Sequence, residues 1–138
     1  MTKVLVVADA SWVRNEVRAT LTSSKYEIID HSDPGTAASM AVSQNVDAVI
    51  TDLQIGAMGG MAVTRSIREA TGSIQSPGLP VVLLLDRHAD NFLARRSGAA
   101  AWLTKPFTSR QLEQALEAAL ESRSYTTGPE NGTGQASE

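Results

Sequence analysis

Short, almost wholly apolar runs recur along the chain and constrain its fold more than any other feature. The four clearest are Val4–Ala8, Ala48–Thr51, Val81–Leu85 and Ala100–Leu103, and a weaker one, Tyr26–His31, lies between the first two. Apolar residues fill consecutive positions in these runs, whereas a strand with one wet face alternates apolar and polar residues. The runs therefore predict strands that are covered on both faces, as in a parallel sheet.

Residues with helical spacing lie between and after these runs. Two such stripes are Val13, Val17 and Leu21, and Leu112, Ala115, Leu116, Ala119 and Leu120. Asp33-Pro34 and a capping box over Thr108–Gln111 mark two helix starts. Because strand and helix alternate five times, the sequence predicts an α/β fold, a doubly wound five-stranded parallel sheet with helices on both faces.

The composition narrows the class of protein. The chain has 138 residues and no cysteine, which suits one domain and excludes a disulfide framework or cysteine-ligated zinc. Its 12 Lys and Arg residues are scattered, so we expect no direct contact with nucleic acid. We find no membrane-spanning run or signal peptide and expect a cytoplasmic location, with no membrane association. Residues 1–121 are expected to form the domain, and residues 122–138, rich in Ser, Thr, Gly and Pro, a disordered tail.

Charged residues end the predicted strands. Asp9 follows the first strand, Asp52 the third, Asp86 the fourth and Lys105 the fifth. Because ligands of open α/β sheets bind beyond the carboxyl ends of the strands, we expect these side chains to converge on one rim. Aspartate at a strand end is also a common helix N-cap, so Asp9 has the alternative role of capping a helix that starts near Ser11.

Such a cluster suits phosphoryl transfer. Two carboxylates about 4 Å apart repel by roughly 4 kcal/mol at an effective dielectric near 20, and a Mg²⁺ ion relieves that repulsion. Lys105 adds an ammonium group suited to a phosphoryl oxygen. The pattern predicts one carboxylate as nucleophile and a metal that neutralises the developing charge. Trp12, near the start of the first predicted helix, is expected to pack under the site, with anchoring of a partner as the alternative.

At these residues the sequence resembles the receiver domain of bacterial two-component response regulators, over nearly all of residues 3–121. The first strand of that family runs into an acidic pair, here VLVVADA. The third delivers the phosphoacceptor, here AVITDLQIGAMGG, and the fifth ends in an aromatic-x-x-Lys-Pro-Phe pattern, here GAAAWLTKPF. The resemblance implies a flavodoxin-like sheet with strand order 2-1-3-4-5.

The resemblance also implies roles for single residues. Asp52 would accept a phosphoryl group from a histidine kinase or phosphotransfer protein. Asp9, Asp52 and the backbone carbonyl of Gln54 would bind Mg²⁺. Lys105 would pair with the phosphoryl group or with Asp52, and Trp102 occupies the place of the aromatic switch residue.

Several positions depart from the pattern of the family. Ala8 replaces the first acid of the pair, so Mg²⁺ binding should be weaker. Leu85 replaces the Ser or Thr that approaches the phosphoryl group, and leucine cannot donate that hydrogen bond. Asp86 stands where a small residue is common; its charge could crowd an incoming phosphate or serve as an acid. Gly56 and Gly59 replace a proline and an acid, so we expect a looser turn after Asp52.

Three functions follow from these residues. The first is a stand-alone response regulator receiver that accepts phosphate on Asp52. Because we expect no further domain after residue 121, it would signal through contacts with a downstream protein; a homodimer is left open. Such a protein is not an enzyme beyond Mg²⁺-dependent self-phosphorylation and dephosphorylation. The alternative, motivated by Ala8 and Leu85, is a pseudo-receiver that binds partners without phosphorylation. A flavin- or nucleotide-binding protein would need a phosphate loop after the first strand, and ADASWVR contains no glycine.

Overall fold

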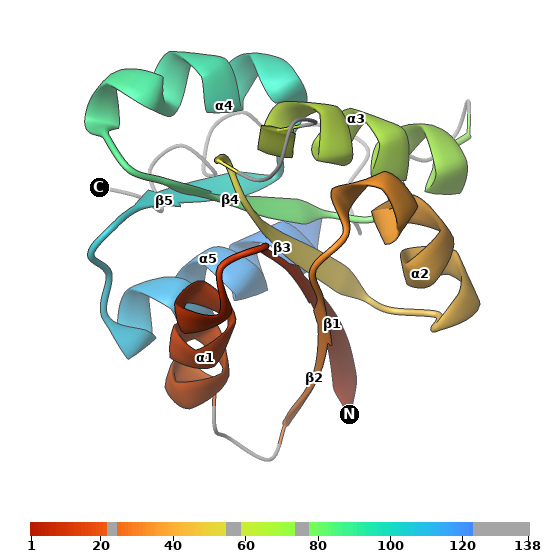
Figure 1. Ribbon diagram of the computed structural model, residues 1–138, viewed down its shortest axis with the longest axis horizontal. Helices are drawn as coiled ribbons and strands as arrows, with labels where there is room; N and C mark the ends of the chain where they lie inside the picture. The colour runs from red at the N-terminus through yellow and green to blue at the C-terminus, as the bar shows by residue number, and fades with distance from the viewer. Residues whose placement is uncertain (22–24, 55–58, 74–77, 123–138) are drawn as a thin grey trace.

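A single parallel sheet organises the chain. The structure, a computed structural model, describes residues 1–21, 25–54, 59–73 and 78–122. Its strands are β1 (Thr2–Val7), β2 (Tyr26–His31), β3 (Ala48–Asp52), β4 (Val81–Leu85) and β5 (Ala101–Thr104). All neighbours pair in parallel and the order is β2-β1-β3-β4-β5 (Figure 1). The predicted fold and strand order are confirmed.

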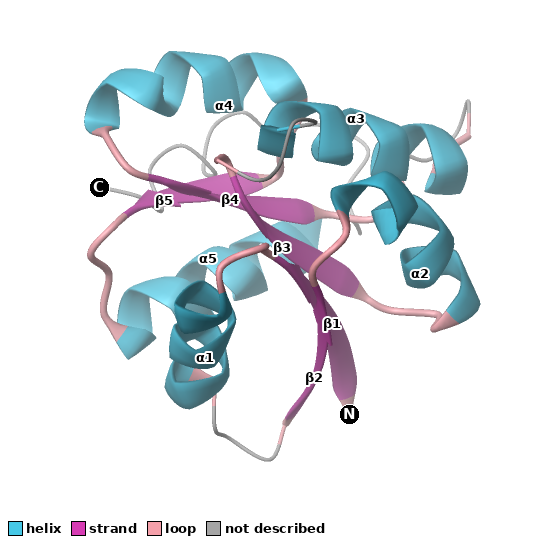
Figure 2. Cartoon of the chain, viewed as in Figure 1, coloured by secondary structure: helices cyan, strands magenta, loops and turns pink. Residues whose placement is uncertain are grey.

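Helices cover both faces of the sheet. They are α1 (Ser11–Thr20), α2 (Ala37–Ser43), α3 (Gly59–Thr71), α4 (Asn91–Ser97) and α5 (Ser109–Ser122), with short 3₁₀ helices η1 (Pro34–Thr36) and η2 (His88–Asp90). Helices α1 and α5 pack on one face, and α2, α3 and α4 on the other (Figure 2). Within the described ranges, every helix is too short or too polar to cross a membrane.

The sheet is apolar on both sides because each strand contributes side chains to separate clusters on its two faces. Val4 and Val6 of β1 pack with α1 and α5, whereas Leu5 and Val7 pack with α2 and α3. Every residue of β4 is buried. This two-sided burial explains why the runs show no alternation of apolar and polar residues.

The element limits differ from the predicted ones by one or two residues. Strand β1 begins at Thr2 and ends at Val7, before Ala8, and β3 extends to Asp52. Backbone hydrogen bonds set these limits, whereas the sequence shows only side-chain polarity. Thr2 has a polar side chain, yet its amide donates to the carbonyl of Lys25 and extends the strand. Ser122, the first residue of the predicted tail, is the last residue of α5. Residues 123–138 lie outside the described part of the chain, so the tail stays a prediction.

Both predicted helix starts are confirmed. The amide of Gln111 donates to Thr108 Oγ1 at 3.1 Å, and the amide of Thr108 donates to Gln111 Oε1 at 2.9 Å, which completes the capping box before α5. Asp33 Oδ1 accepts a hydrogen bond from the amide of Gly35 at 3.0 Å. The helix that Asp33 caps is the short η1, which leads directly into α2.

Two glycines fix the start of α3 against the end of β3. The amide of Gly60 donates to the carbonyl of Leu53 at 2.8 Å. A Cβ at position 60 would collide with the carbonyl oxygen of Asp52 and lie 2.7 Å from Leu53 Cα. Gly59 has a φ of 80°, a conformation that other residues adopt at a cost. These glycines therefore hold the helix close to Asp52. Gly56, the other glycine of the predicted loose turn, lies outside the described residues.

We predict that Gly60→Ala destabilises the fold by about 2 kcal/mol, because the new methyl group meets backbone atoms that cannot rotate away. Denaturant unfolding followed by circular dichroism measures the change. Gly35→Ala is the matched control, since a Cβ there meets only the Asp33 carboxylate, at 3.4 Å. Equal stability of the two variants would contradict the close packing of α3 on β3.

Candidate functional site

The carboxyl ends of four strands meet at one edge of the sheet. Val7 pairs with Thr51, so Ala8 continues beside Asp52 and Asp9 lies one residue further. Asp52 itself pairs with Leu84 of β4. The amide of Lys105, just after β5, donates to the carbonyl of Leu85 at 2.8 Å. The residues that sequence reasoning placed on one rim therefore follow adjacent strands.

Lys105 joins two of the predicted carboxylates. Its Nζ donates to Asp52 Oδ1 at 3.0 Å and to Asp86 Oδ1 at 3.1 Å. The Asp52 side chain is 6% exposed and the Lys105 side chain 16%, whereas the Asp86 side chain is 50% exposed. Lys105 thus links one buried and one exposed carboxylate. The peptide bond between Lys105 and Pro106 is cis.

Burial and pairing oppose each other in this cluster. Burial raises the pKa of Asp52 above its ordinary value, and the hydrogen bond and charge of Lys105 only partly reverse that effect. Burial lowers the pKa of Lys105, but its bonds to Asp52 and Asp86 outweigh burial, so the net direction is upward. Lys105 is therefore a stable cation beside a poorly hydrated carboxylate.

Asp9 is exposed and lies two residues beyond the end of β1. Helix α1 begins at Ser11 and its N-cap position is Ala10, so Asp9 does not occupy the N-cap position that was its alternative role. The guanidinium group of Arg14 donates to the carbonyl of Ala8. Asp9 and Gln54 are both exposed.

The oxygen donors at and beyond the ends of β1 and β3 fit a cation with few protein ligands. Among the residues that the structure describes, no three His, Cys, Asp or Glu side chains are grouped for a metal. Two carboxylates, those of Asp9 and Asp52, follow neighbouring strands, and the Gln54 carbonyl is two residues beyond Asp52. Mg²⁺ binds through one or two carboxylates and keeps several waters, so this donor set suits a weakly held Mg²⁺.

Leu85 fills an apolar cluster. It is fully buried and packs in one cluster with Leu53, Leu83, Ala94 and Trp102. Trp102 is 3% exposed, and its Nε1 is buried without a hydrogen-bond partner in the described structure. The side chains at both predicted switch positions are thus held in the same cluster, under α4.

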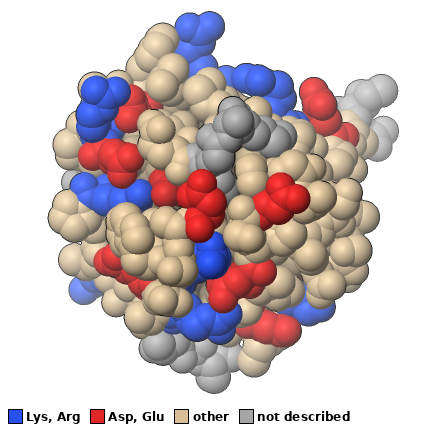
Figure 3. Space-filling view, viewed as in Figure 1, with Lys and Arg blue, Asp and Glu red and all other residues tan. Residues whose placement is uncertain are grey.

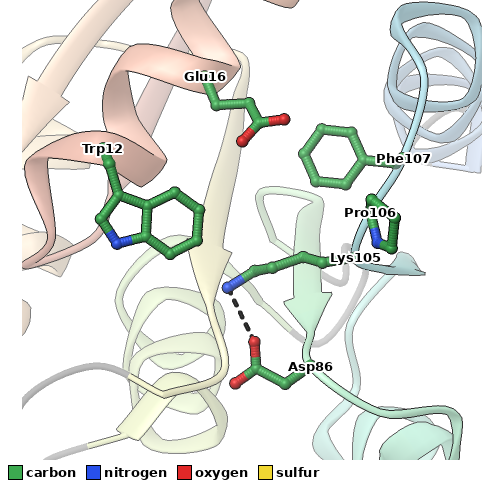
Figure 4. A pocket seen from close by; sticks show the side chains of 6 residues that line it. All are labelled: Trp12, Glu16, Asp86, Lys105, Pro106 and Phe107. Atoms are coloured by element: carbon green, nitrogen blue, oxygen red, sulfur yellow. Dashed lines mark hydrogen bonds and ion pairs between the residues drawn. The ribbon is translucent and has the colours of Figure 1, made fainter.

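A pocket of about 340 Å³ opens beside Lys105, between α1 and the segment that follows β5 (Figure 4). Its lining residues are Trp12, Glu16, Asp86, Lys105, Pro106 and Phe107. The Trp12 ring centroid lies 5.4 Å from Lys105 Nζ. Trp12 is 59% exposed, so the expectation that it packs under the site is wrong; its ring lies over the lysine at the pocket wall.

Sequence reasoning missed Glu16 as a member of this pocket. The available signal was its spacing of four residues from Trp12, which places both side chains on one side of a helix. Acidic and basic side chains are interspersed across the face shown in Figure 3, and basic side chains form no continuous patch there.

Comparisons with known proteins agree with this geometry. The chain is 30% identical over 126 residues to the probable transcriptional regulatory protein TcrX of Mycobacterium tuberculosis, covering 90% of this chain and 52% of TcrX. It is 24% identical over 122 residues to protein PilH of Pseudomonas aeruginosa, covering 87% of this chain and 98% of PilH. The chain thus spans about half the length of TcrX and nearly all of PilH.

A solved structure shares the fold. The receiver domain of the sensor histidine kinase PA1611 of Pseudomonas aeruginosa, with a magnesium ion coordinated in its active-site cleft, matches with a TM-score of 0.74. The two sequences are 24% identical, and the match covers 87% of this chain and 98% of that domain. The family model for the response regulator receiver domain matches residues 4–117. The chain belongs to the response regulator receiver domain family.

Proposed function

We propose that this domain accepts a phosphoryl group on Asp52 from a phosphohistidine of a histidine kinase or phosphotransfer protein, and passes the signal on by binding a downstream protein. One observation carries the proposal. Lys105 Nζ lies 3.0 Å from Asp52 Oδ1 at the end of a buried strand, which leaves a carboxylate nucleophile beside a cation.

The chemistry is a displacement at phosphorus. A carboxylate oxygen of Asp52 attacks the phosphorus, the P–O bond forms, and the P–N bond of the donor breaks with its electron pair passing to the imidazole. The product is an acyl phosphate on Asp52. Lys105 compensates the negative charge on the phosphoryl oxygens during transfer, as a fixed cation does in other phosphoryl-transfer sites.

Asp9, Asp52 and the Gln54 carbonyl would hold Mg²⁺. When bound, the ion supplies positive charge that offsets the carboxylates and the phosphoryl oxygens. Ala8 provides no oxygen ligand beyond its backbone, and Arg14 already donates to that carbonyl. We therefore assign this chain a weaker metal site than an acidic pair would form.

The first prediction from the proposed function concerns the acceptor. Incubation of the protein with Mg²⁺ and acetyl phosphate should add the mass of one phosphoryl group, and Asp52→Asn should add none, because an amide oxygen is a poor nucleophile. Intact-protein mass spectrometry measures both. Asp30→Asn is the control, since Asp30 lies on β2 and pairs with Arg18 of α1 at 2.7 Å. If Asp52→Asn still gains the mass of a phosphoryl group, the acceptor is a residue other than Asp52.

The second prediction concerns the metal. Ala8 is 1% exposed and lies in the cluster under α1 and α5, so the folding of Ala8→Asp is checked first by circular dichroism. In the folded variant the new carboxylate should tighten Mg²⁺ binding about tenfold, roughly 1.4 kcal/mol. Titration followed by Trp12 fluorescence measures the change, as that ring lies beside Lys105. Ala8→Asn is the matched variant with similar size and no charge. An unchanged affinity in Ala8→Asp would place the metal away from β1.

Leu85 favours a second candidate function, a pseudo-receiver that binds its partner whether or not Asp52 is modified. A leucine that is fully buried against Trp102 offers no hydroxyl to a phosphoryl group. Under this alternative, Asp52 can be phosphorylated while the surface over α4 stays the same.

The third prediction separates the two functions. If the pseudo-receiver alternative holds, beryllofluoride bound at Asp52 should leave the indole N–H signal of Trp102 nearly unshifted in an NMR spectrum. Leu85→Thr should make that signal respond, at a stability cost of about 2–3 kcal/mol from lost apolar burial. Leu83→Thr, in the same cluster but further from the rim, is the control. A large Trp102 shift in the unaltered protein would favour the switching receiver.

A further inference from the structure

Asp86 is the second carboxylate on Lys105, and it stands at the open side of the site. Its side chain is half exposed, whereas that of Asp52 is almost wholly buried. Figure 4 shows the Asp86 carboxylate pointing at the lysine amine from the wall of the pocket. Both Oδ1 atoms accept from the same nitrogen, so Asp86 lies close to any group that reaches Asp52.

The charges around Lys105 do not balance. One ammonium group serves two carboxylates, and Glu16 adds another carboxylate to the lining of the same pocket. A phosphoryl donor that approaches Asp52 brings more negative charge to this place. It must also share the ammonium group of Lys105 with Asp86.

Among the described residues, the hydrogen bond and ion pair with Lys105 are the contacts that the Asp86 side chain makes. The N-cap of η2 is Arg87, not Asp86. The buried Asp90 nearby is already paired with Arg87 at 3.0 Å. Removal of the Asp86 charge would leave Lys105 bonded to the buried Asp52. Asp86 is therefore free to act on the chemistry without holding the fold.

We propose that Asp86 is a specificity-determining residue for the phosphoryl donor. Its carboxylate competes with doubly charged small donors for the ammonium group of Lys105. It therefore favours donors that carry a positive charge beside their phosphoryl group. The inference rests on the proposed function at Asp52. In a protein donor, that positive charge would be a basic side chain next to the phosphohistidine, able to pair with Asp86 and release Lys105. Asp86 forms no covalent bond in the transfer.

The test compares the rates at which two small donors phosphorylate Asp52. The full chain is used for every variant, and each variant is saturated with Mg²⁺. Acetyl phosphate is a dianion near pH 8, whereas the protonated nitrogen of phosphoramidate offsets one of its phosphate charges. Asp86→Asn should raise the rate of Asp52 phosphorylation by acetyl phosphate about tenfold, and that by phosphoramidate about twofold, because the removed charge acts more on the dianion. Quenched samples analysed by intact mass give the rates.

Two variants and a salt series separate charge from structure. Asp86→Glu should keep the donor preference of the unaltered protein. Asp30→Asn removes an exposed carboxylate that also pairs with a cation, and should leave the preference unchanged. Added salt should narrow the gap between the unaltered protein and Asp86→Asn, because the Asp86 charge is half exposed to solvent.

An equal rise with both donors, or no change in either rate while the unaltered protein is phosphorylated, would overturn the assignment of Asp86. Failure of every variant to take phosphate from either donor would overturn the proposed function itself, and the role of Asp86 with it. The two failures are distinct, because the first requires a phosphorylated unaltered protein.

Discussion

A carboxylate as buried as Asp52 keeps its charge only if a partner compensates the lost hydration, and Lys105 is that partner. The two residues are 53 positions apart in sequence, and β4 lies between their strands in the sheet. Their ion pair therefore requires the sheet order, the parallel direction of the strands and the length of each strand to be correct. The close approach of α3 at Gly60 adds a backbone contact at the same strand end.

Two substitutions relative to the family pattern change the charge around this pair in opposite places. Ala8 removes a carboxylate on the side of β1, where a metal would bind. Asp86 adds one on the side of β4, where it bonds to Lys105. In this chain the second carboxylate bonded to Lys105 therefore comes from the end of β4 and not from β1. Under the proposed function, a weaker Mg²⁺ site and a shared lysine would both follow from this placement of charge.

The sequence predicts the parts of this site that depend on strand periodicity. Continuous apolar runs identify buried strands, and the residues after them, Asp52 and Lys105, then converge because parallel strands end together. It does not predict the contacts that depend on side-chain direction. The sequence does not determine whether the Asp86 side chain points toward Lys105 or toward solvent. It also does not determine whether the Trp12 ring packs inward or lies against Lys105. The need for glycine at Gly60 is also hidden, since it comes from a close backbone approach.

The same geometry limits how the site can communicate with α4. Within the described part of the chain, Leu85 and Trp102 lie in one buried apolar cluster, and a leucine side chain has no group that could donate a hydrogen bond. The polar contacts instead follow the chain: Lys105 holds Asp86, and the next residue, Arg87, binds Asp90, the N-cap residue of α4. If phosphate on Asp52 competes with Asp86 for Lys105, the contact between Asp86 and Lys105 is the first to be lost. Asp86 is next in sequence to Arg87, which forms the ion pair with Asp90.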